Sequence, residues 1–592
     1  MSILADLNPA QQEAVRFGEG PLLILAGAGS GKTRVLTHRV AYLISQGVAP
    51  EEIILLTFTN KASEEMLRRI TGTKPTGGTF HSFCARLLRR NNPDFVIFDE
   101  ADQLDTIKQA MIAVGMDPRA VKPASVLHTI SQAKNELIGP QEYADYARGD
   151  FQKMVVRVYL AYQQLLKKYK ALDFDDLLIE AVKLLREQPE KRWRYVLVDE
   201  YQDTNKAQYE ITKLLAKKYQ NLTAVGDFSQ SIYSWRGADY RNLLLLKQDF
   251  PGLKTINLEQ NYRSTQIILD AANKVISKNK NHPILKLWTA KGGGEKIELY
   301  EADSETDEAK YVISQMKNNY SDYAVLYRTN AQSRVFEEAF LHAGVPYVLV
   351  GGTRFYERKE IKDVVCYLRL VMNPEDDVAR KRAEKIGKGR LAKLEATGNK
   401  TIEILDSVLK STGYIELFNP DDEEDLARLE NIKELRSVAM EFPKLPEFLE
   451  NIALTEREAN RRRSSGSAVT LMTLHAAKGL EFKNVFMVGM EEGLFPHSRA
   501  LMEPEQMEEE RRLAYVGMTR AMDKLYLTYA RRRLYFGSRS NNPVSRFVTD
   551  VPESLMEANM GIRKPKRRGV ENWGFDVEGN WKWSPGGDNL PF

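Results

Sequence analysis

The sequence predicts an α/β protein with two parallel sheets, in which a helical insertion interrupts each half of the chain. Short apolar runs alternate with segments of helical spacing, which is typical of parallel sheets. A glycine-rich turn joins the first apolar run to an amphipathic segment, so strand, loop and helix are expected in that order. Two long, charged and leucine-rich stretches break the alternation and predict the insertions.

The first half is expected to contain apolar strands followed by helices. Residues 86–192 interrupt it and are rich in Leu, Ala, Lys, Gln and Glu at helical spacing, so we expect a helical insertion there. The predicted strands of this half are the runs at residues 21–25, 53–58, 195–198 and 222–225.

A second alternation begins near Thr255, where the run 255–258 has the same strand character. Residues 323–328 and 346–352 continue it, and two more apolar segments follow a second helical stretch. These transitions give the expected boundaries of five parts. They are a first α/β domain at 1–86 and 190–254, its insertion at 87–189, a second α/β domain at 255–374 and 467–551, its insertion at 375–466, and a flexible basic and aromatic tail at 552–592.

Composition excludes several classes of protein. A chain of 592 residues suggests roughly four domains at ~150 residues each. The formal net charge is +4, from 85 basic and 81 acidic residues, so contact with nucleic acid must rest on local positive charge. The two cysteines, Cys84 and Cys366, are too few for a zinc ribbon or a four-cysteine cluster. Without a membrane-length apolar run or a signal peptide, a cytoplasmic protein with no membrane contact is expected.

The segment AGAGSGKT, residues 26–33, has the pattern of a phosphate-binding loop, with Ala26 in place of the first glycine. Its glycines let backbone N–H groups curve around a polyphosphate, and the helix that follows adds its positive N-terminal end. Lys32 would neutralise the β- and γ-phosphates, and the Thr33 hydroxyl would ligate Mg²⁺. The alternative is a glycine-rich turn in an unrelated fold.

Acidic and basic residues elsewhere supply the remaining groups for nucleotide hydrolysis. Asp199 would reach Mg²⁺, and Glu200 beside it would polarise the attacking water. Arg263 and Arg520 lie in the second half and would stabilise the transferred phosphoryl group if the nucleotide binds between the halves. The alternative is a solvent-facing acidic pair and two surface arginines in ion pairs.

The aromatic segment VGDFSQSIYSWRGA indicates contact with single-stranded nucleic acid. Tyr233, Trp235 and Arg236 form a set on which bases stack at about 1–3 kcal/mol each. For either aromatic residue alone, packing in a core is the alternative. The alternation with polar residues and the adjacent arginine favour a surface.

These motifs, taken in order, resemble those of the UvrD/PcrA/Rep family of superfamily-one DNA helicases. The resemblance implies two RecA-like P-loop NTPase motor domains with ATP and Mg²⁺ in the cleft between them. It also implies ATP-dependent 3′→5′ travel on single-stranded DNA and unwinding of 3′-tailed duplex DNA, in repair, replication restart or recombination control. It covers the chain to about Pro552 and rests on LNPAQQ, AGAGSGKTR, LTFTNKA, TFHS, VDEYQDTN, VGDFSQSIYSWRGA, LEQNYRST, TLHAAKGLEF and VGMTRA.

The resemblance assigns roles to individual residues. The implied catalytic residues are Lys32, Glu200, Gln230 (as γ-phosphate sensor), Arg263 and Arg520, and the implied Mg²⁺ ligands are Thr33 and Asp199. The implied ATP-binding residues are Gln11 and Tyr262 at adenine, Arg34 by the base, Glu481 at the ribose, and Ala26, Gly27, Ala28, Gly29, Ser30, Gly31, Lys32, Thr33, Arg263 and Arg520. The implied DNA-binding residues are Thr59, Asn60, His81, Arg236, His475 and the base-stacking Phe58, Tyr233, Trp235 and Phe536.

The sequence departs from the family pattern at two points. Ser229 stands where the family usually has Asp, outside the main catalytic positions, so we expect little loss. The second insertion is shorter than is typical of the family. Gly387, Lys388 and Gly389 survive in it and resemble the family's duplex-gripping hairpin, in which glycines let backbone N–H groups approach a phosphate. A simple helix–helix turn is the alternative.

The tail and the overall function leave alternatives open. RKPKRRG, residues 563–569, would hold DNA or an acidic partner, or be a solvated linker, and DNLPF at the terminus is similar to tips that dock on replication partners. The main hypothesis is a 3′→5′ DNA helicase. A translocase that mainly displaces proteins from DNA and unwinds poorly alone is the first alternative, because the second insertion is short. The ~40 residues after Pro552 disfavour a helicase–nuclease subunit, and the complete set of ATP-site residues disfavours a non-enzymatic DNA-binding protein.

Overall fold

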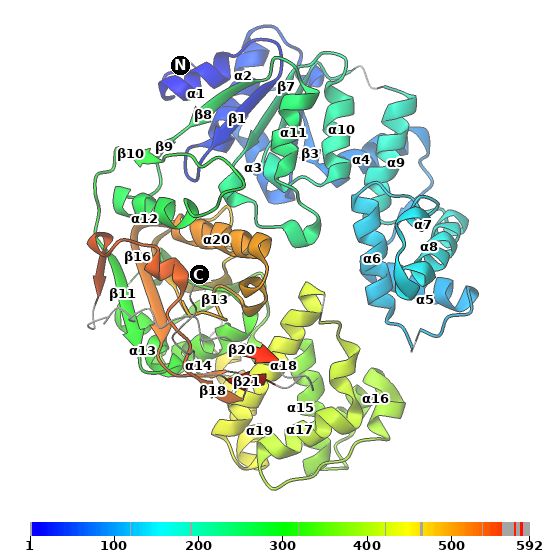
Figure 1. The fold of residues 1–592 in the computed structure, drawn as a ribbon, viewed down its shortest axis with the longest axis vertical. Helices are drawn as coiled ribbons and strands as arrows, with labels where there is room; N and C mark the ends of the chain where they lie inside the picture. The colour runs from blue at the N-terminus through cyan, green and yellow to red at the C-terminus, as the bar shows by residue number, and fades with distance from the viewer. Residues whose placement is uncertain are drawn as a thin grey trace, which may run out of the picture.

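Two parallel sheets, each with a helical lobe beside it, make up the chain in the computed structural model (Figure 1). Phe536 and the tail segments RKPKRRG and DNLPF lie outside the residues that the structure describes. The described residues are 3–70, 72–118, 120–189, 192–317, 319–420, 422–461, 466–535, 537–558, 573–575 and 581–583.

The first sheet has the strand order β3-β2-β6-β7-β1-β8, and each of its neighbouring pairs is parallel. Its strands are apolar on both faces because helices cover both sides of the sheet. In β1, Leu23 packs into the layer that contains Phe83, whereas Ile24 packs into the opposite layer with Val35. The strands are β1 (Leu22–Ala26), β2 (Ile53–Thr57), β3 (Thr76–Thr79), β6 (Tyr195–Val198), β7 (Leu222–Gly226) and β8 (Lys254–Leu258).

Seven helices form the two layers on the first sheet. The first helix has a strong N-terminal signal, since Asn8 and Gln11 form a reciprocal capping box and Pro9 occupies the first turn. One layer consists of α1 (Pro9–Arg16), α2 (Lys32–Ser45) and α3 (Asn60–Arg69). The other consists of α4 (Phe80–Asn91), α9 (Phe174–Glu187), α10 (Lys206–Ala216) and α11 (Arg241–Asp249).

The first insertion is a helical lobe with its own core, in which Ile107, Ile130 and Val158 are fully buried. A two-stranded parallel ribbon closes its base. Its elements are β4 (Val96–Ile97), α5 (Glu100–Ala113), α6 (Pro123–Asn135), α7 (Tyr143–Tyr146), α8 (Gly149–Tyr169) and β5 (Ala171–Leu172).

The second sheet has the order β13-β14-β12-β15-β16-β11-β19, again with parallel neighbours. Its strands are β11 (Ile297–Ala302), β12 (Tyr323–Tyr327), β13 (Tyr347–Val350), β14 (Val469–Thr473), β15 (Phe482–Met487), β16 (Ala521–Ala530) and β19 (Met556–Ala558). Around it lie α12 (Gln266–Ile276), α13 (Glu305–Ser314), α14 (Ser333–Ala343), α20 (Pro504–Met518), α21 (Arg546–Thr549) and the hairpin β17 (Arg533–Tyr535) and β18 (Ser538–Ser540). Beyond Ala558, the described residues form the antiparallel strands β20 (Trp573–Phe575) and β21 (Trp581–Trp583).

The second insertion is a helical lobe fixed to the second sheet's helices by buried polar contacts. The Nε of Arg334, in α14, donates to Glu434 at 2.7 Å, and the Nη2 of Arg358, at the start of the lobe, donates to the Ser333 hydroxyl in α14 at 2.7 Å. Figure 1 shows this lobe at the bottom of the view, below the second sheet. Its helices are α15 (Lys359–Met372), α16 (Asp377–Leu391), α17 (Thr401–Thr412), α18 (Glu423–Glu441) and α19 (Leu445–Arg461).

The expected α/β class and parallel sheets are confirmed, but several boundaries differ from those expected. The strand at 255–258, expected to open the second domain, pairs with β1 in the first sheet. Helices α4 and α9 extend into the range assigned to the first insertion, yet they pack in the core of the first sheet. Helix α15 lies before residue 375 but packs with the second insertion, and β19, assigned to the tail, completes the second sheet. Apolar spacing shows that an element is half-buried, but not which core it packs against.

Within the described residues, the chain passes between the two halves at one connector, residues 259–263. The connector includes β9 (Gln260–Asn261), which pairs with β10 (Trp288–Thr289). Because β8 neighbours β1, this connector leaves the first sheet beside the phosphate-binding loop. No helix in the described part of the chain is long and apolar enough to span a membrane.

Candidate nucleotide and DNA sites

The loop between β1 and α2 has the shape that phosphate binding requires. Gly29 and Gly31 have φ values of +64° and +85°, which a residue with a side chain rarely adopts. At Gly29 an added Cβ would lie 2.6 Å from the Asn261 amide and 2.8 Å from the Arg263 Cβ. The loop therefore turns tightly into the N-terminus of α2, where a helix favours an anion, and it is packed against the connector.

The residues implied to bind adenine surround this loop, but one of them is already engaged. The buried Gln11 side chain donates to the Ser30 carbonyl at 2.9 Å and accepts from the Asn8 backbone at 3.1 Å. Tyr262 is 42% exposed and accepts a 2.9 Å hydrogen bond from the Asn8 amide. Arg34 lies half-buried in the first turn of α2. To hydrogen-bond adenine, the Gln11 amide would therefore have to give up its bond to the Ser30 carbonyl or to the Asn8 backbone.

Two carboxylates stand at the end of β6, opposite the loop. The Lys32 ammonium lies 3.5 Å from Glu200, whose backbone is left-handed at φ +49°. Burial opposes ionisation of Glu200, but attraction to Lys32 and Lys478 outweighs it and lowers its pKa to about 2. Burial and then repulsion from Glu200 raise the pKa of Asp199 to about 7. The two lysines therefore favour the ionised form of Glu200, whereas burial and Glu200 disfavour the ionised form of Asp199.

Asp199 has the donor chemistry for a magnesium ion that bridges to phosphates. Its Oδ1 is buried and has no hydrogen-bond partner. Magnesium in nucleotide sites takes one or two protein oxygens and completes its shell with phosphates and water. Asp199 and the Thr33 hydroxyl, in the first turn of α2, fit this need.

Two arginines of the second half, Arg263 and Arg520, lie near the phosphate-binding loop and Glu200 of the first half. Arg263 contacts the loop at Gly29, and its guanidinium donates to Glu481 at 2.7 Å and to the Thr519 carbonyl at 3.2 Å. Among the described residues, no carboxylate forms an ion pair with Arg520, which is 1% exposed. Burial and then repulsion from Arg263 lower the pKa of Arg520 to about 9, while attraction to Glu200 opposes them. A buried guanidinium without a carboxylate partner is suited to an incoming phosphate.

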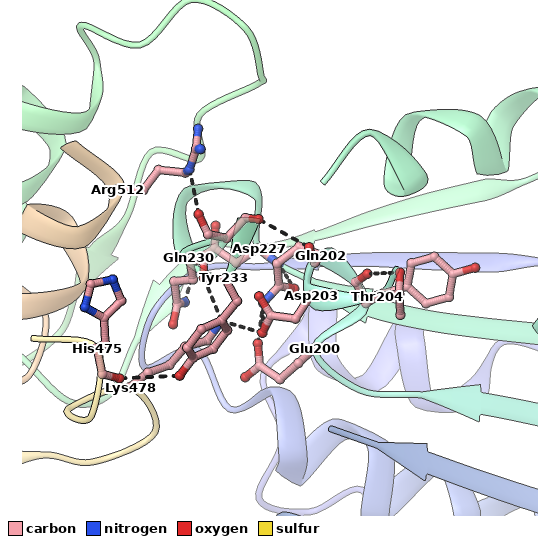
Figure 2. Close-up of polar contacts among 12 residues, drawn as sticks. Glu200, Gln202, Asp203, Thr204, Asp227, Gln230, Tyr233, His475, Lys478 and Arg512 are labelled. Carbon is pink, nitrogen blue, oxygen red and sulfur yellow. Dashed lines mark hydrogen bonds and ion pairs between the residues drawn. The ribbon is translucent and has the colours of Figure 1, made fainter. Parts of the chain in front are cut away.

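A polar network links Glu200 to the second half, as Figure 2 shows. Gln202 donates to Glu200 at 2.5 Å and accepts from the Asp227 backbone at 3.0 Å. Asp227 in turn accepts from Gln230 at 2.6 Å. Lys478, from the second half, donates to Asp203 at 2.5 Å and to the Gln230 carbonyl at 2.6 Å. The implied γ-phosphate sensor is thus held from both halves.

Three aromatic side chains, Phe58, Tyr233 and Trp235, form a cluster beside this network, which we call the aromatic floor. Phe58 and Tyr233 are stacked, with ring centroids 5.8 Å apart and planes 10° apart. Trp235 meets Tyr233 edge-on at 6.5 Å, and the Arg236 guanidinium lies 4.4 Å from the Trp235 ring centre. The Lys478 ammonium lies 5.0 Å from the Tyr233 ring centre. One lysine therefore touches both the aromatic floor and the carboxylate network.

A cleft of about 1440 Å³ opens above this floor, between the two halves and their insertions. Of the residues implied to bind DNA, Phe58, His81, Trp235, Arg236 and His475 line it. The insertions approach each other at its rim, where Lys122 donates to the Phe418 carbonyl at 2.5 Å and His128 lies 3.8 Å from Asp422.

The other implied DNA residues lie apart from the cleft lining or serve local structure. Thr59 caps α3 through a 3.2 Å bond from the Ala62 backbone, and Asn60 begins that helix at the surface. Gly387 breaks α16 with φ 158° and ψ 117°, and Lys388 and Gly389 beside it are exposed. Figure 1 shows α16 on the outer side of the second insertion, away from both sheets.

Sequence reasoning missed several residues that organise the site. Asn8, Asn261, Gln202, Asp203 and Lys478 each join segments far apart in the chain. All five lie within motifs that the sequence analysis quoted, namely LNPAQQ, VDEYQDTN, LEQNYRST and TLHAAKGLEF. The signal that could have identified them is a polar residue inside a motif that also contains a predicted site residue.

Comparison with known proteins agrees with this fold. The description "UvrD/REP helicase N-terminal domain" matches residues 7–251, and "UvrD-like helicase C-terminal domain" matches residues 256–421 and 414–532. The chain is 44% identical to the ATP-dependent DNA helicase PcrA of Bacillus subtilis, over 95% of this chain and 88% of that protein. Proteins of the same name from Staphylococcus epidermidis and Staphylococcus aureus are each 41% identical, over 95% and 97% of this chain and 88% and 90% of theirs.

The fold is that of a P-loop motor with two α/β domains joined at the nucleotide loop. The chain belongs to the UvrD/REP helicase family, as the motifs predicted.

Proposed function

We propose that this protein is an ATP-dependent DNA helicase that moves 3′→5′ on single-stranded DNA and unwinds 3′-tailed duplexes. The observation that carries the proposal is the meeting of both halves at one loop. Arg263 packs on Gly29, and Arg520 lies close enough to Glu200 to be influenced by its charge. Hydrolysis then needs ligands from both halves, so it depends on the position of one half relative to the other.

The residues of the site divide the work of hydrolysis. The loop amides and Lys32 would bind the phosphates of ATP. Thr33 and Asp199 would hold Mg²⁺, which would supply charge neutralisation at the phosphates. The ionised Glu200 accepts a hydrogen bond from the attacking water and orients it. Arg263 and Arg520 stabilise the negative charge that develops on the phosphoryl group.

Lys478 supports coupling between DNA and ATP. Its ammonium lies on the Tyr233 ring while it donates to Asp203 and Gln230. A base that stacks on the aromatic floor would shift Tyr233, and Lys478 would shift the polar network with it. DNA binding would thereby reset the groups that orient water and sense the γ-phosphate.

The remaining features extend this proposal to DNA travel and location. Phe58, Trp235 and Arg236, which line the cleft, would hold successive bases there together with Tyr233, which stacks on Phe58. The exposed Lys388 between two glycines would contact duplex phosphate. Work in repair, replication restart or recombination control, a cytoplasmic location and a protein partner for the C-terminal tail complete the proposal.

Unwinding of 3′-tailed against 5′-tailed duplexes by the purified chain, with and without ATP, tests it. We expect ATP-dependent strand separation of the 3′-tailed substrate alone. Preference for the 5′ tail would refute the polarity. Displacement of a bound protein from single-stranded DNA without strand separation would instead favour the translocase.

A further inference from the structure

We propose that Asn261 is a positioning residue for ATP hydrolysis, which holds Arg263 against the phosphate-binding loop. This inference rests on the proposed function, because it concerns the arginine that meets the nucleotide. Asn261 ends strand β9 in the connector between the halves, and it is 1% exposed.

The Asn261 amide joins the two halves with three hydrogen bonds. Its Nδ2 donates to the Ala28 carbonyl, in the loop, at 2.6 Å. Its Oδ1 accepts from the backbone N–H groups of Arg263 and Ser264, each at 2.8 Å. One rigid, planar group therefore connects the loop of the first half with the turn that begins the second.

The partners of Asn261 require an amide. The Ala28 carbonyl can only accept a hydrogen bond, and the two backbone N–H groups can only donate. Aspartate has the same shape, but it would place a carboxylate oxygen against the Ala28 carbonyl and lose the donor. A buried acceptor without its donor carries a desolvation penalty, so the turn would move away from the loop.

Contacts of the backbone show that the turn and the loop fit closely at this point. Gly29 has no room for a Cβ, because Asn261 and Arg263 occupy that space. The Tyr262 N–H donates to the Gly29 carbonyl at 2.9 Å. The main chain of Arg263 is therefore fixed relative to the loop, whereas the Nε of its guanidinium donates a hydrogen bond to the Glu481 carboxylate at 2.7 Å.

These contacts mean that the loop sets the position of the Arg263 backbone. A phosphate bound in the loop would find the arginine's backbone at a set distance, so only the side chain has to turn from Glu481 to the phosphate. Displacement of a catalytic group by about 1 Å lowers a rate by roughly 100-fold. Loss of the Asn261 bond should therefore reduce turnover more than it reduces ATP binding.

The test compares Asn261→Asp with Asn279→Asp in the full chain. Asn279 is a matched control, since it is also buried in the second half and its Nδ2 donates to a backbone carbonyl, that of Glu508, at 2.9 Å. We expect Asn261→Asp to lower kcat of DNA-stimulated ATP hydrolysis by roughly 10- to 100-fold, with KM for ATP changed less than about 3-fold. Asn279→Asp should leave both constants near those of the wild type.

A double-mutant cycle separates positioning from general damage. In an Arg263→Ala background, Asn261→Asp should cost less than about 3-fold in kcat, because the group that it positions is gone. Should Asn261→Asp fail to fold, Asn261→Ser, whose hydroxyl can donate to one partner, is measured in the same cycle. An unchanged kcat, or an equal loss with and without Arg263, would overturn the proposal. A wild-type chain without DNA-stimulated ATPase would refute the proposed function itself.

Discussion

Lys478 of the second half donates a 2.5 Å hydrogen bond to the buried Asp203 carboxylate of the first half. The same ammonium lies 5.0 Å from the ring centre of Tyr233, in the aromatic floor of the cleft. Its contacts thus connect the surface proposed for bases with the groups proposed for hydrolysis. Attraction to Lys478 also favours the ionised form of Glu200.

Replacement of Lys478 by methionine should uncouple DNA binding from hydrolysis. Methionine keeps the bulk of the side chain but loses the charge that joins Asp203 to the floor. We expect the rate increase on adding single-stranded DNA to fall by about tenfold or more, a change of ~1.4 kcal/mol, with less effect on the rate without DNA. Lys483→Met is the control, since Lys483 pairs with Asp322 on the surface. Equal losses with and without DNA would reject the coupling role.

Lys32→Ala should abolish ATP hydrolysis and unwinding while binding of single-stranded DNA largely persists. Lys32 is the cation of the phosphate-binding loop, and it contacts Glu200 rather than the aromatic floor. ATPase assays, strand-separation assays and fluorescence anisotropy with a labelled oligonucleotide check these three outcomes. Normal unwinding by the variant would refute the assignment of the nucleotide site.

Trp235→Ala should weaken single-stranded DNA binding by about 1–3 kcal/mol, the amount typical for loss of one stacked base. DNA-stimulated ATPase should fall far more than ATPase without DNA, because Trp235 lines the cleft but not the nucleotide loop. Tyr146→Ala is a suitable control, since Tyr146 is exposed on the first insertion and does not line the cleft. A similar loss in both variants would contradict the stacking role.

The buried pair of Arg334 and Glu434 should matter for stability when only one partner is removed. Glu434→Ala would remove the carboxylate that lies 2.7 Å from the buried Arg334 guanidinium and leave Glu338, at 2.9 Å, as its nearest partner. We therefore expect a cost at the lower end of the about 3–5 kcal/mol that follows the loss of one partner of a buried pair. The double change Arg334→Met and Glu434→Leu should restore much of the free energy of unfolding, measured in urea. Glu447→Ala, which breaks the exposed pair with Lys444, should cost less than about 1 kcal/mol. Equal costs for both single changes would show that the pair is not effectively buried.

Sequence patterns predicted the strands that carry the nucleotide loop and the acidic pair to within a residue or two. β1, β6 and β7 are short, apolar and buried at every position except Leu25, so their composition alone marks them. The pattern did not reveal β3, with the sequence TGGT, because its glycines give no apolar signal. It also placed 255–258 in the wrong sheet, since a strand's residues do not encode its neighbour.

For the site, sequence reasoning supplied residue types but not their partners. It named Arg263 and Arg520 as groups from the second half, and the structure places both at the loop or near Glu200. It did not name Asn261 or Lys478, because their importance lies in hydrogen bonds to Ala28 and Asp203, which are 233 and 275 residues away in the chain. Such pairings depend on how the two sheets dock, which no local pattern contains.

The connector at residues 259–263 leaves the first sheet on β8, next to the strand that leads into the nucleotide loop. A nucleotide in this loop would therefore lie beside the point at which the chain passes from one half to the other. A small rotation of one half against the other at this point would change the width of the cleft that both halves and both insertions line.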